Sequence, residues 1–225
     1  MTKIIRAPRL LVLVAITALT ALALATAAGV AAAPGKDKGK AGAKGYKVSR
    51  GTTTLDLSAG ATSALAAAGV TLSVDSPAEA DREGNLAFPV TNGRVKVTKN
   101  GAGAITAATG KISHTGGFTL TKGDTTISVR NLRIVLDSDP DLTALVTAAG
   151  ETSRISIADV EPDLSEIGIT STGKRKRWLR IENVVVKLNQ GSVDALNGFF
   201  GTPFTAGAEL GTADVKTRII GRFPA

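Results

Sequence analysis

The chain has 225 residues, which is enough for one domain with a substantial apolar core. It contains no cysteine, and this excludes disulfides, thiolate metal sites and a cysteine nucleophile. The net charge of +8 is concentrated near the N-terminus: residues 1–33 carry three basic residues and no acid, and residues 34–50 carry six basic residues and one acid. Residues 51–225 hold 18 basic and 18 acidic residues, so we predict a folded domain without the net positive charge that binding to nucleic acid requires.

The first 33 residues have the pattern of an export signal. Three basic residues precede an apolar run from Leu10 to Ala25, and small residues then lead to an A-x-A-like cleavage site at 31–33. The run is shorter than the roughly 20 residues that a spanning helix needs, so we predict a cleaved signal peptide rather than a membrane anchor. No second run of that length follows. The mature chain is therefore predicted to be secreted or associated with the cell envelope, without an integral membrane segment.

Residues 34–50, PGKDKGKAGAKGYKVSR, are predicted to form a disordered basic linker. Glycine and lysine alternate, apolar residues are few, and the like charges repel one another. Such a segment can contact anionic polymers or lipid headgroups at a cell surface. For a short run without further pattern, a solvated spacer is the favoured interpretation.

From Thr52 onward the chain is predicted to be all-β apart from short helices. Runs rich in Thr, Val and Ile alternate between apolar and polar residues, and polar stretches with Gly or Pro separate them. Asn92-Gly93 is typical of a hairpin turn, and Pro89, which has no N–H to donate, indicates an edge or bulged strand. The predicted strands are 52–57, 70–75, 86–90, 93–98, 129–137, 142–149, 153–160, 168–172, 178–188 and 209–220.

The stretch from Gly110 to Val129 is predicted to form a two-stranded hairpin. Its apolar residues occupy alternate positions and so share one face, and Lys122-Gly123-Asp124 supplies the turn. The only histidine of the chain, His114, shares this face and lies next to Gly116-Gly117. A lone histidine on a strand is more often structural than ligating, and both roles stay open here.

A faint internal repeat predicts two short helices. Residues 184–201 resemble residues 52–69, and each copy has a strand, a capping residue (Ser58 or Asn189), a short helical run and a glycine stop. The pattern indicates one supersecondary unit used at both ends of a domain. Chance similarity in a chain rich in Ala, Gly and Leu is the alternative.

Residues suited to catalysis are few. No nucleophile-elbow motif accompanies the single histidine. The acids Asp137, Asp139 and Asp141 have the spacing of a calcium loop but lack its central glycine and closing glutamate, so a solvated turn is favoured. The basic cluster 174–177 beside Trp178 could grip a phosphate, an acidic polymer or a partner, but a charged turn that keeps a strand edge soluble is the simpler interpretation. We therefore predict that the protein is not an enzyme.

Several short motifs follow one another in a set order along the chain: Leu55-Asp56, Phe88-Pro89, Gly110, His114, Gly117, Leu120 and Asn131. In this order they resemble the HtaA-type domain of actinobacterial secreted haem-uptake proteins. The resemblance covers roughly residues 52–160. It implies an antiparallel β-sandwich with one or two short helices at its rim, spanning 51–225. It also implies haem as a cofactor, a haem or haem-transfer partner at the cell surface, and His114 as the residue that remains to bind haem and ligate its iron.

Two features of that family are missing here. Its helix carries a tyrosine that ligates haem iron, whereas residues 58–68 are all small apart from one leucine, and Ala66 stands near the expected tyrosine position. The tryptophan that usually follows Leu-Asp is Leu57, and the only tyrosine, Tyr46, falls in the predicted linker. We therefore expect weak, His114-dependent haem binding or haem relay. The alternative function is a structural or adhesive cell-envelope protein of the same fold without a haem site, and a secreted hydrolase is the least favoured class.

The export pattern predicts a processed chain. Intact-mass measurement of protein recovered from culture supernatant is expected to show the loss of about 32 residues, because cleavage falls within the alanine-rich site. Full-length chain found in the membrane fraction would contradict this prediction.

Overall fold

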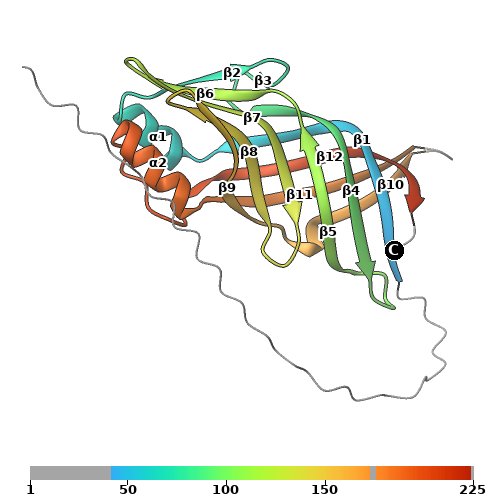
Figure 1. The fold of residues 1–225 in the computed structure, drawn as a ribbon. Helices are drawn as coiled ribbons and strands as arrows, with labels where there is room; N and C mark the ends of the chain where they lie inside the picture. The colour runs from blue at the N-terminus through green and yellow to red at the C-terminus, as the bar shows by residue number, and fades with distance from the viewer. Residues whose placement is uncertain (1–41, 173–175, 224–225) are drawn as a thin grey trace, which may run out of the picture. The chain divides into compact units, whose positions relative to one another are not determined.

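The computed structural model describes residues 42–172 and 176–223. The predicted signal peptide and residues 34–41 of the predicted linker lie outside the described residues. Antiparallel strands dominate the described chain, and two short helices lie together at one end of it (Figure 1). The predicted all-β antiparallel fold with short helices is therefore confirmed.

The described strands form one 12-stranded antiparallel sheet. The helical segments are α1 (Ala59–Ala67), α2 (Gln190–Phe200) and the short 3-10 turn η1 (Leu164–Glu166). The strands are β1 (Gly42–Leu57), β2 (Thr71–Asp75), β3 (Glu79–Ala80), β4 (Leu86–Lys99), β5 (Ile105–His114), β6 (Gly117–Lys122), β7 (Thr125–Leu136), β8 (Asp141–Ala148), β9 (Glu151–Glu161), β10 (Ile167–Thr172), β11 (Lys176–Leu188) and β12 (Glu209–Phe223).

The sheet closes on itself. Its strand order is β2-β6-β7-β5-β4-β1-β12-β11-β9-β8, and β3 and β10 pair with β4 and β11 outside this path. Because β7 also pairs with β8, the eight strands from β7 to β8 in this order form a ring. Opposite parts of the sheet face each other across one shared core, as expected for the predicted sandwich, and all eight ring strands line a small cavity in its centre.

Strand β1 begins earlier than predicted, so the boundary of the linker is corrected. Residues 42–50 form the first part of β1 and pair with both β4 and β12. Tyr46 and Val48 flank the exposed Lys47 and are each only 4% exposed. Lys47, which lies between these two residues, points outward, as the alternation of side chains along a strand requires. The segment was predicted to be a linker because it is rich in lysine and glycine and has only these two inward-facing side chains.

The turn predicted at Asn92-Gly93 is wrong, because β4 runs through this dipeptide without interruption. A β-carbon at Gly93 would lie 2.4 Å from the carbonyl oxygen of Lys111 on β5. The glycine is therefore required for the close approach of two strands rather than for a turn. The neighbouring bulge expected from Pro89 is present, as a register shift between Val90 and Asn92.

The stretch from 110 to 129 contributes to three strands instead of two. The end of β5 carries His114, and β6 and β7 form the predicted hairpin around Gly123, whose φ is +55°. Gly116 separates β5 from β6 with φ +80°, in the left-handed region that glycine favours. A side chain at Gly116 would also meet the backbone of Ala78. The shared inward face of the apolar positions is confirmed.

Both helices of the internal repeat are present. Ser58 caps α1 by accepting a hydrogen bond from the N–H of Ala61, and Asn189 caps α2 by accepting one from Ser192. Each helix follows directly on a long strand, β1 or β11, and α2 ends at the left-handed Gly201. Neither helix, nor any other in the described part of the chain, is long and apolar enough to span a bilayer.

The early start of β1 leads to a prediction about truncation. A chain that begins at residue 42 is expected to keep the melting temperature of the longer mature chain. A chain that begins at residue 51 should lose at least about 4 kcal/mol of unfolding free energy, because it loses two buried side chains and a strand that pairs on both sides. Urea denaturation of both truncations measures the difference. Equal stabilities would contradict the assignment of residues 42–50 to the fold.

Candidate functional site

His114 lies in the centre of the fold and is only 5% exposed. Its Nε2 is 2.7 Å from the hydroxyl of Thr53 on β1, and its Nδ1 is 3.2 Å from the carbonyl oxygen of Leu132 on β7. Because a carbonyl can only accept, Nδ1–H donates to Leu132 and Nε2 accepts from the Thr53 hydroxyl. Both ring nitrogens are thus used within the protein, and the ring joins three strands of the core.

The environment of His114 keeps the ring neutral. Burial lowers the pKa of His114 from its usual 6.5 to about 4, and the hydrogen bond to Leu132 opposes this shift. The cavity beside the ring has a volume of about 30 Å³, which is room for about one water molecule and far too little for a porphyrin. Iron ligation by His114 stays a prediction of the resemblance. In the described structure it would require breaking the bond to Thr53 and opening the core.

The other residues considered from sequence lie apart from one another. Ala66 is exposed on α1 and lines neither cavity. Tyr46 is buried, with the guanidinium of Arg177 5.4 Å from the centre of its ring. In the predicted acidic turn, Asp137 accepts a hydrogen bond from the backbone N–H of Asp139, as in a simple turn. Among the described residues, no group of three or more His, Asp or Glu side chains is placed to hold a metal ion.

A much larger apolar cavity lies at the helical end of the sheet. Its volume is about 380 Å³, and it lies between α1, α2 and the inner faces of the strands. Aliphatic and phenylalanine side chains dominate its lining, and the polar residues among them are Glu151, Ser153 and Ser192. The principal lining side chains are Leu57, Leu65, Leu72, Phe118, Leu120, Val129, Val146, Ile155, Leu196, Phe199 and Phe204.

This cavity opens where β9 and β11 separate. The two strands pair only over residues 158–161 of β9, and residues 151–156 pair with β8 alone. Beyond that point β11 ends and α2 continues beside β9. Two residues at this gap line the cavity and are large, apolar and exposed: Ile155 of β9 at 40% and Phe199 of α2 at 43%. They mark the mouth of the cavity.

Hydrogen bonds hold α2 over the gap. At its start, the Ser192 hydroxyl donates to the carbonyl oxygen of Ile157 at 2.6 Å, and the Asn189 amide donates to the Ser156 hydroxyl at 3.1 Å. At its end, the Lys122 ammonium donates to the carbonyl oxygen of Phe200 at 2.7 Å. A cation at this position satisfies an orphan carbonyl and complements the negative end of the helix dipole. The helix is therefore held at both ends by hydrogen bonds to strands or to the β6–β7 hairpin.

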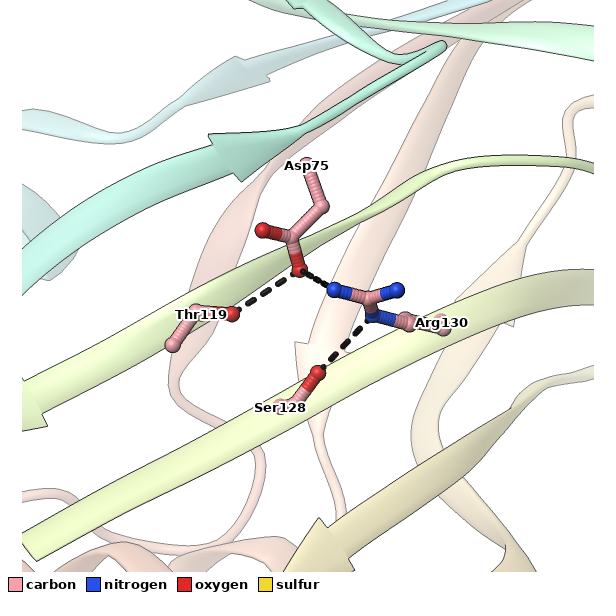
Figure 2. Close-up of polar contacts among 4 residues, drawn as sticks. All are labelled: Asp75, Thr119, Ser128 and Arg130. Carbon is pink, nitrogen blue, oxygen red and sulfur yellow. Dashed lines mark hydrogen bonds and ion pairs between the residues drawn. The ribbon is translucent and has the colours of Figure 1, made fainter.

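A polar cluster on the outer surface of the sheet joins side chains of β2, β6 and β7 (Figure 2). Asp75 accepts a hydrogen bond from the Thr119 hydroxyl at 2.9 Å and pairs with Arg130 at 3.2 Å. Arg130 also donates from Nε to the Ser128 hydroxyl at 3.1 Å. The Arg130 side chain is 58% exposed, so this ion pair contributes at most about 1 kcal/mol. The cluster connects β2, β6 and β7, whose inner faces line the cavity.

Sequence reasoning missed this cavity, although it predicted most of the elements around it. The lining side chains come from both helices and from strands throughout the chain, and no spacing in the sequence brings them together. The repeat did predict α1 and α2. The available hint was the adjacent Phe199-Phe200 pair at the end of the second predicted helix. One of these rings is buried and the other is exposed.

Comparison with known proteins agrees with this architecture. No family model and no curated protein matches the chain. Among solved structures, it is similar to the C-terminal domain of HtaA from Corynebacterium glutamicum, with a TM-score of 0.52 and 14% identity, covering 78% of this chain and 99% of that one. The chain has an HtaA-like fold. A domain-swapped dimer variant of the same HtaA domain gives a TM-score of 0.42 at 16% identity, over 68% of this chain and 85% of that one.

The predicted resemblance is thus confirmed at the level of the fold. At 14% identity the similarity to the HtaA domain concerns the backbone, so it does not specify the side chains of a binding site.

The buried imidazole predicts a specific pH dependence of stability. Because the folded pKa of His114 is depressed, its stabilising contribution is complete above pH 6.5 and is lost as the pH falls toward 4. Lowering the pH from about 7.5 to about 5 should therefore cost the wild type about 2 kcal/mol of unfolding free energy through this residue. Urea denaturation at the two pH values measures the loss. His114→Gln should lack this part of it, and an equal loss in both proteins would contradict the prediction.

Proposed function

We propose that the protein is a non-enzymatic binding module that holds an apolar small molecule in the cavity beneath α2. The cavity itself is the observation that supports this function. Its volume of about 380 Å³ lies within the range of roughly 300–1,000 Å³ found for ligand pockets. Interiors of proteins are otherwise packed to the density of organic crystals, so an apolar space of this size is a feature to be explained by a ligand.

The lining defines the chemical class of the ligand. The walls offer dispersion contacts and apolar surface to a hydrocarbon chain or a flat ring system. The polar residues Glu151 and Ser153 are exposed and belong to the β8–β9 turn region and the start of β9. An apolar body with one polar end, bound with that end outward, satisfies both parts of the site.

The described residues do not fit haem as an iron-ligated cofactor. No His, Tyr, Met or Cys side chain lines the larger cavity, and His114 lies in the separate small one. If a porphyrin is the ligand, apolar contact with its ring would hold it. Iron-free porphyrin should then bind as tightly as haem, in the micromolar range expected for burial without ligation.

The export pattern in the first 33 residues also indicates where the protein acts. We propose that the module acts outside the cytoplasm, secreted or at the cell envelope, and that it takes its ligand from or passes it to a surface partner. The opening between β9 and α2 would be the route, because the exposed lining residues Ile155 and Phe199 lie on these two elements.

Filling the cavity tests this function. Ala195 of α2 lines the cavity and is half-buried, so Ala195→Trp should lower affinity for a fatty acid and for iron-free protoporphyrin by at least tenfold. Isothermal titration calorimetry measures the change. The matched control is Ala66→Trp, on the exposed side of α1, which should bind within twofold of wild type. His114→Gln should also leave the affinity unchanged.

Two outcomes would contradict the proposal. Binding of haem that is lost in His114→Gln but kept in Ala195→Trp would place the ligand at the central histidine. If neither fatty acid nor porphyrin binds to the wild type, the structural or adhesive alternative for this fold is favoured.

A further inference from the structure

The outer surface of the sheet carries a continuous group of basic side chains, away from the helices. In one row across three strands, Lys47 of β1 lies opposite Arg94 of β4, which lies opposite Lys111 of β5. All three are exposed and follow or precede buried residues, so they face outward. We call the full group the basic wall: Lys47 and Arg50 of β1, Arg94 and Lys96 of β4, Lys111 of β5, Arg180 of β11, and Lys216 and Arg218 of β12.

The wall continues on the other side of β1. Arg50 lies opposite Arg218 of β12, and Lys216 of the same strand lies opposite Arg180 of β11. With neighbouring strands about 4.8 Å apart, the five strands span about 20 Å. Adjacent charges are closer than the Debye length of about 8–10 Å, so their potentials add.

Few acids offset these charges on the same surface. Over the stretches 47–52, 94–98, 109–113, 178–182 and 212–220, the outward-facing acids are Glu182, paired with Arg180 at 3.1 Å, and Asp214, which accepts from the N–H of Asn183 at 2.9 Å. The balanced composition of residues 51–225 therefore conceals an uneven distribution. Part of the difference arises because Lys47 and Arg50, counted with the linker in the sequence, belong to β1.

This arrangement carries a cost in the isolated protein. Like charges directly opposite each other on neighbouring strands are destabilising, and both the Lys47–Arg94–Lys111 row and the Arg50–Arg218 pair have this geometry. An anionic surface placed against the wall would attract these cations and so offset their mutual repulsion.

Apolar groups within the wall indicate what kind of anionic surface fits. Ile220 lies opposite Lys47 and is 43% exposed, although its neighbour Ile219 is buried. Trp178 is half-buried, and the ammonium of Lys216 lies 5.8 Å from the centre of its ring. Cations mixed with an exposed aliphatic side chain and an indole suit a lipid interface, where headgroups meet hydrocarbon.

We propose that the basic wall docks on the surface of a bilayer that contains anionic phospholipid. This proposal does not depend on a ligand in the cavity, because the wall and the cavity share no residue. Docking would hold the module at a membrane without any spanning segment. It uses the outer face of β5, β4, β1, β12 and β11, whereas the cavity lies on the inner face beneath the helices.

Vesicle sedimentation tests the proposal with the chain from residue 34 onward, which contains every described element. Wild type should sediment with phosphatidylcholine–phosphatidylglycerol vesicles and remain in solution with pure phosphatidylcholine. The variants Lys47→Gln and Lys111→Gln should each lower the partition coefficient by about fivefold, and the double variant by about twenty-five-fold. Arg82→Gln, which removes an exposed cation outside the wall, is the matched control and should change it less than twofold.

Three results would overturn the proposal. One is equal binding to neutral and anionic vesicles, and another is binding by the double variant as strong as by the Arg82→Gln control. The third is binding to a soluble polyanion such as polyphosphate without binding to anionic vesicles, which would assign the wall to a polymer instead. Supporting data would also show release as NaCl rises from about 0.05 to about 0.5 M, since added salt screens these charges. Circular dichroism of each variant verifies the fold.

Discussion

Pairing between β7 and β8 closes the sheet, and the rest of the structure depends on this closure. Once a ring of eight strands is fixed, the width of its interior is set by backbone geometry and not by the side chains inside it. In the middle of the ring, aliphatic side chains, Phe88 and His114 fill the space almost completely. At the helical end, two helices of mostly small residues cover a space that they do not fill. The cavity thus arises because the width of the ring stays the same along its length, whereas the volume of the side chains inside it decreases toward the helical end.

The hydrogen bonding of His114 follows from the closure of the ring. In the centre of a closed ring a polar side chain must find its hydrogen bonds within the protein, and His114 does so through Thr53 and Leu132. The neutral imidazole, hydrogen-bonded through both nitrogens, links β5 to β1 and β7. The same motif that carries the resemblance to HtaA-type domains is therefore explained by packing alone, and a shared motif of this kind marks a shared fold before it marks a shared ligand.

Much of the fold could be predicted from the sequence because local patterns determine it. Period-two alternation located most strands, and the Ser58 and Asn189 caps located both helices. The predictions were wrong where the local structure depends on contacts with strands that are distant in the sequence. Gly93 looked like part of a turn because its close contact with β5 is invisible along the chain. Residues 42–50 looked like a linker because only two of their side chains, Tyr46 and Val48, reach the core. The candidate site could not be predicted for the same reason: its lining is assembled by ring closure from residues far apart in sequence.

The register between the first and last strands has a consequence for how the module can be attached. Gly45 near the start of β1 is the partner of Phe223 at the end of β12. At the opposite ends of the same strands, Leu57 is the partner of Gly211, and α1 follows directly. Entry and exit of the folded chain therefore adjoin each other at the end remote from the helices. A tether, a fusion partner or a neighbouring domain joined at either terminus would hold the molecule by that end and leave the mouth between β9 and α2 unobstructed, and a short peptide joining the two ends would permit a circularly permuted chain.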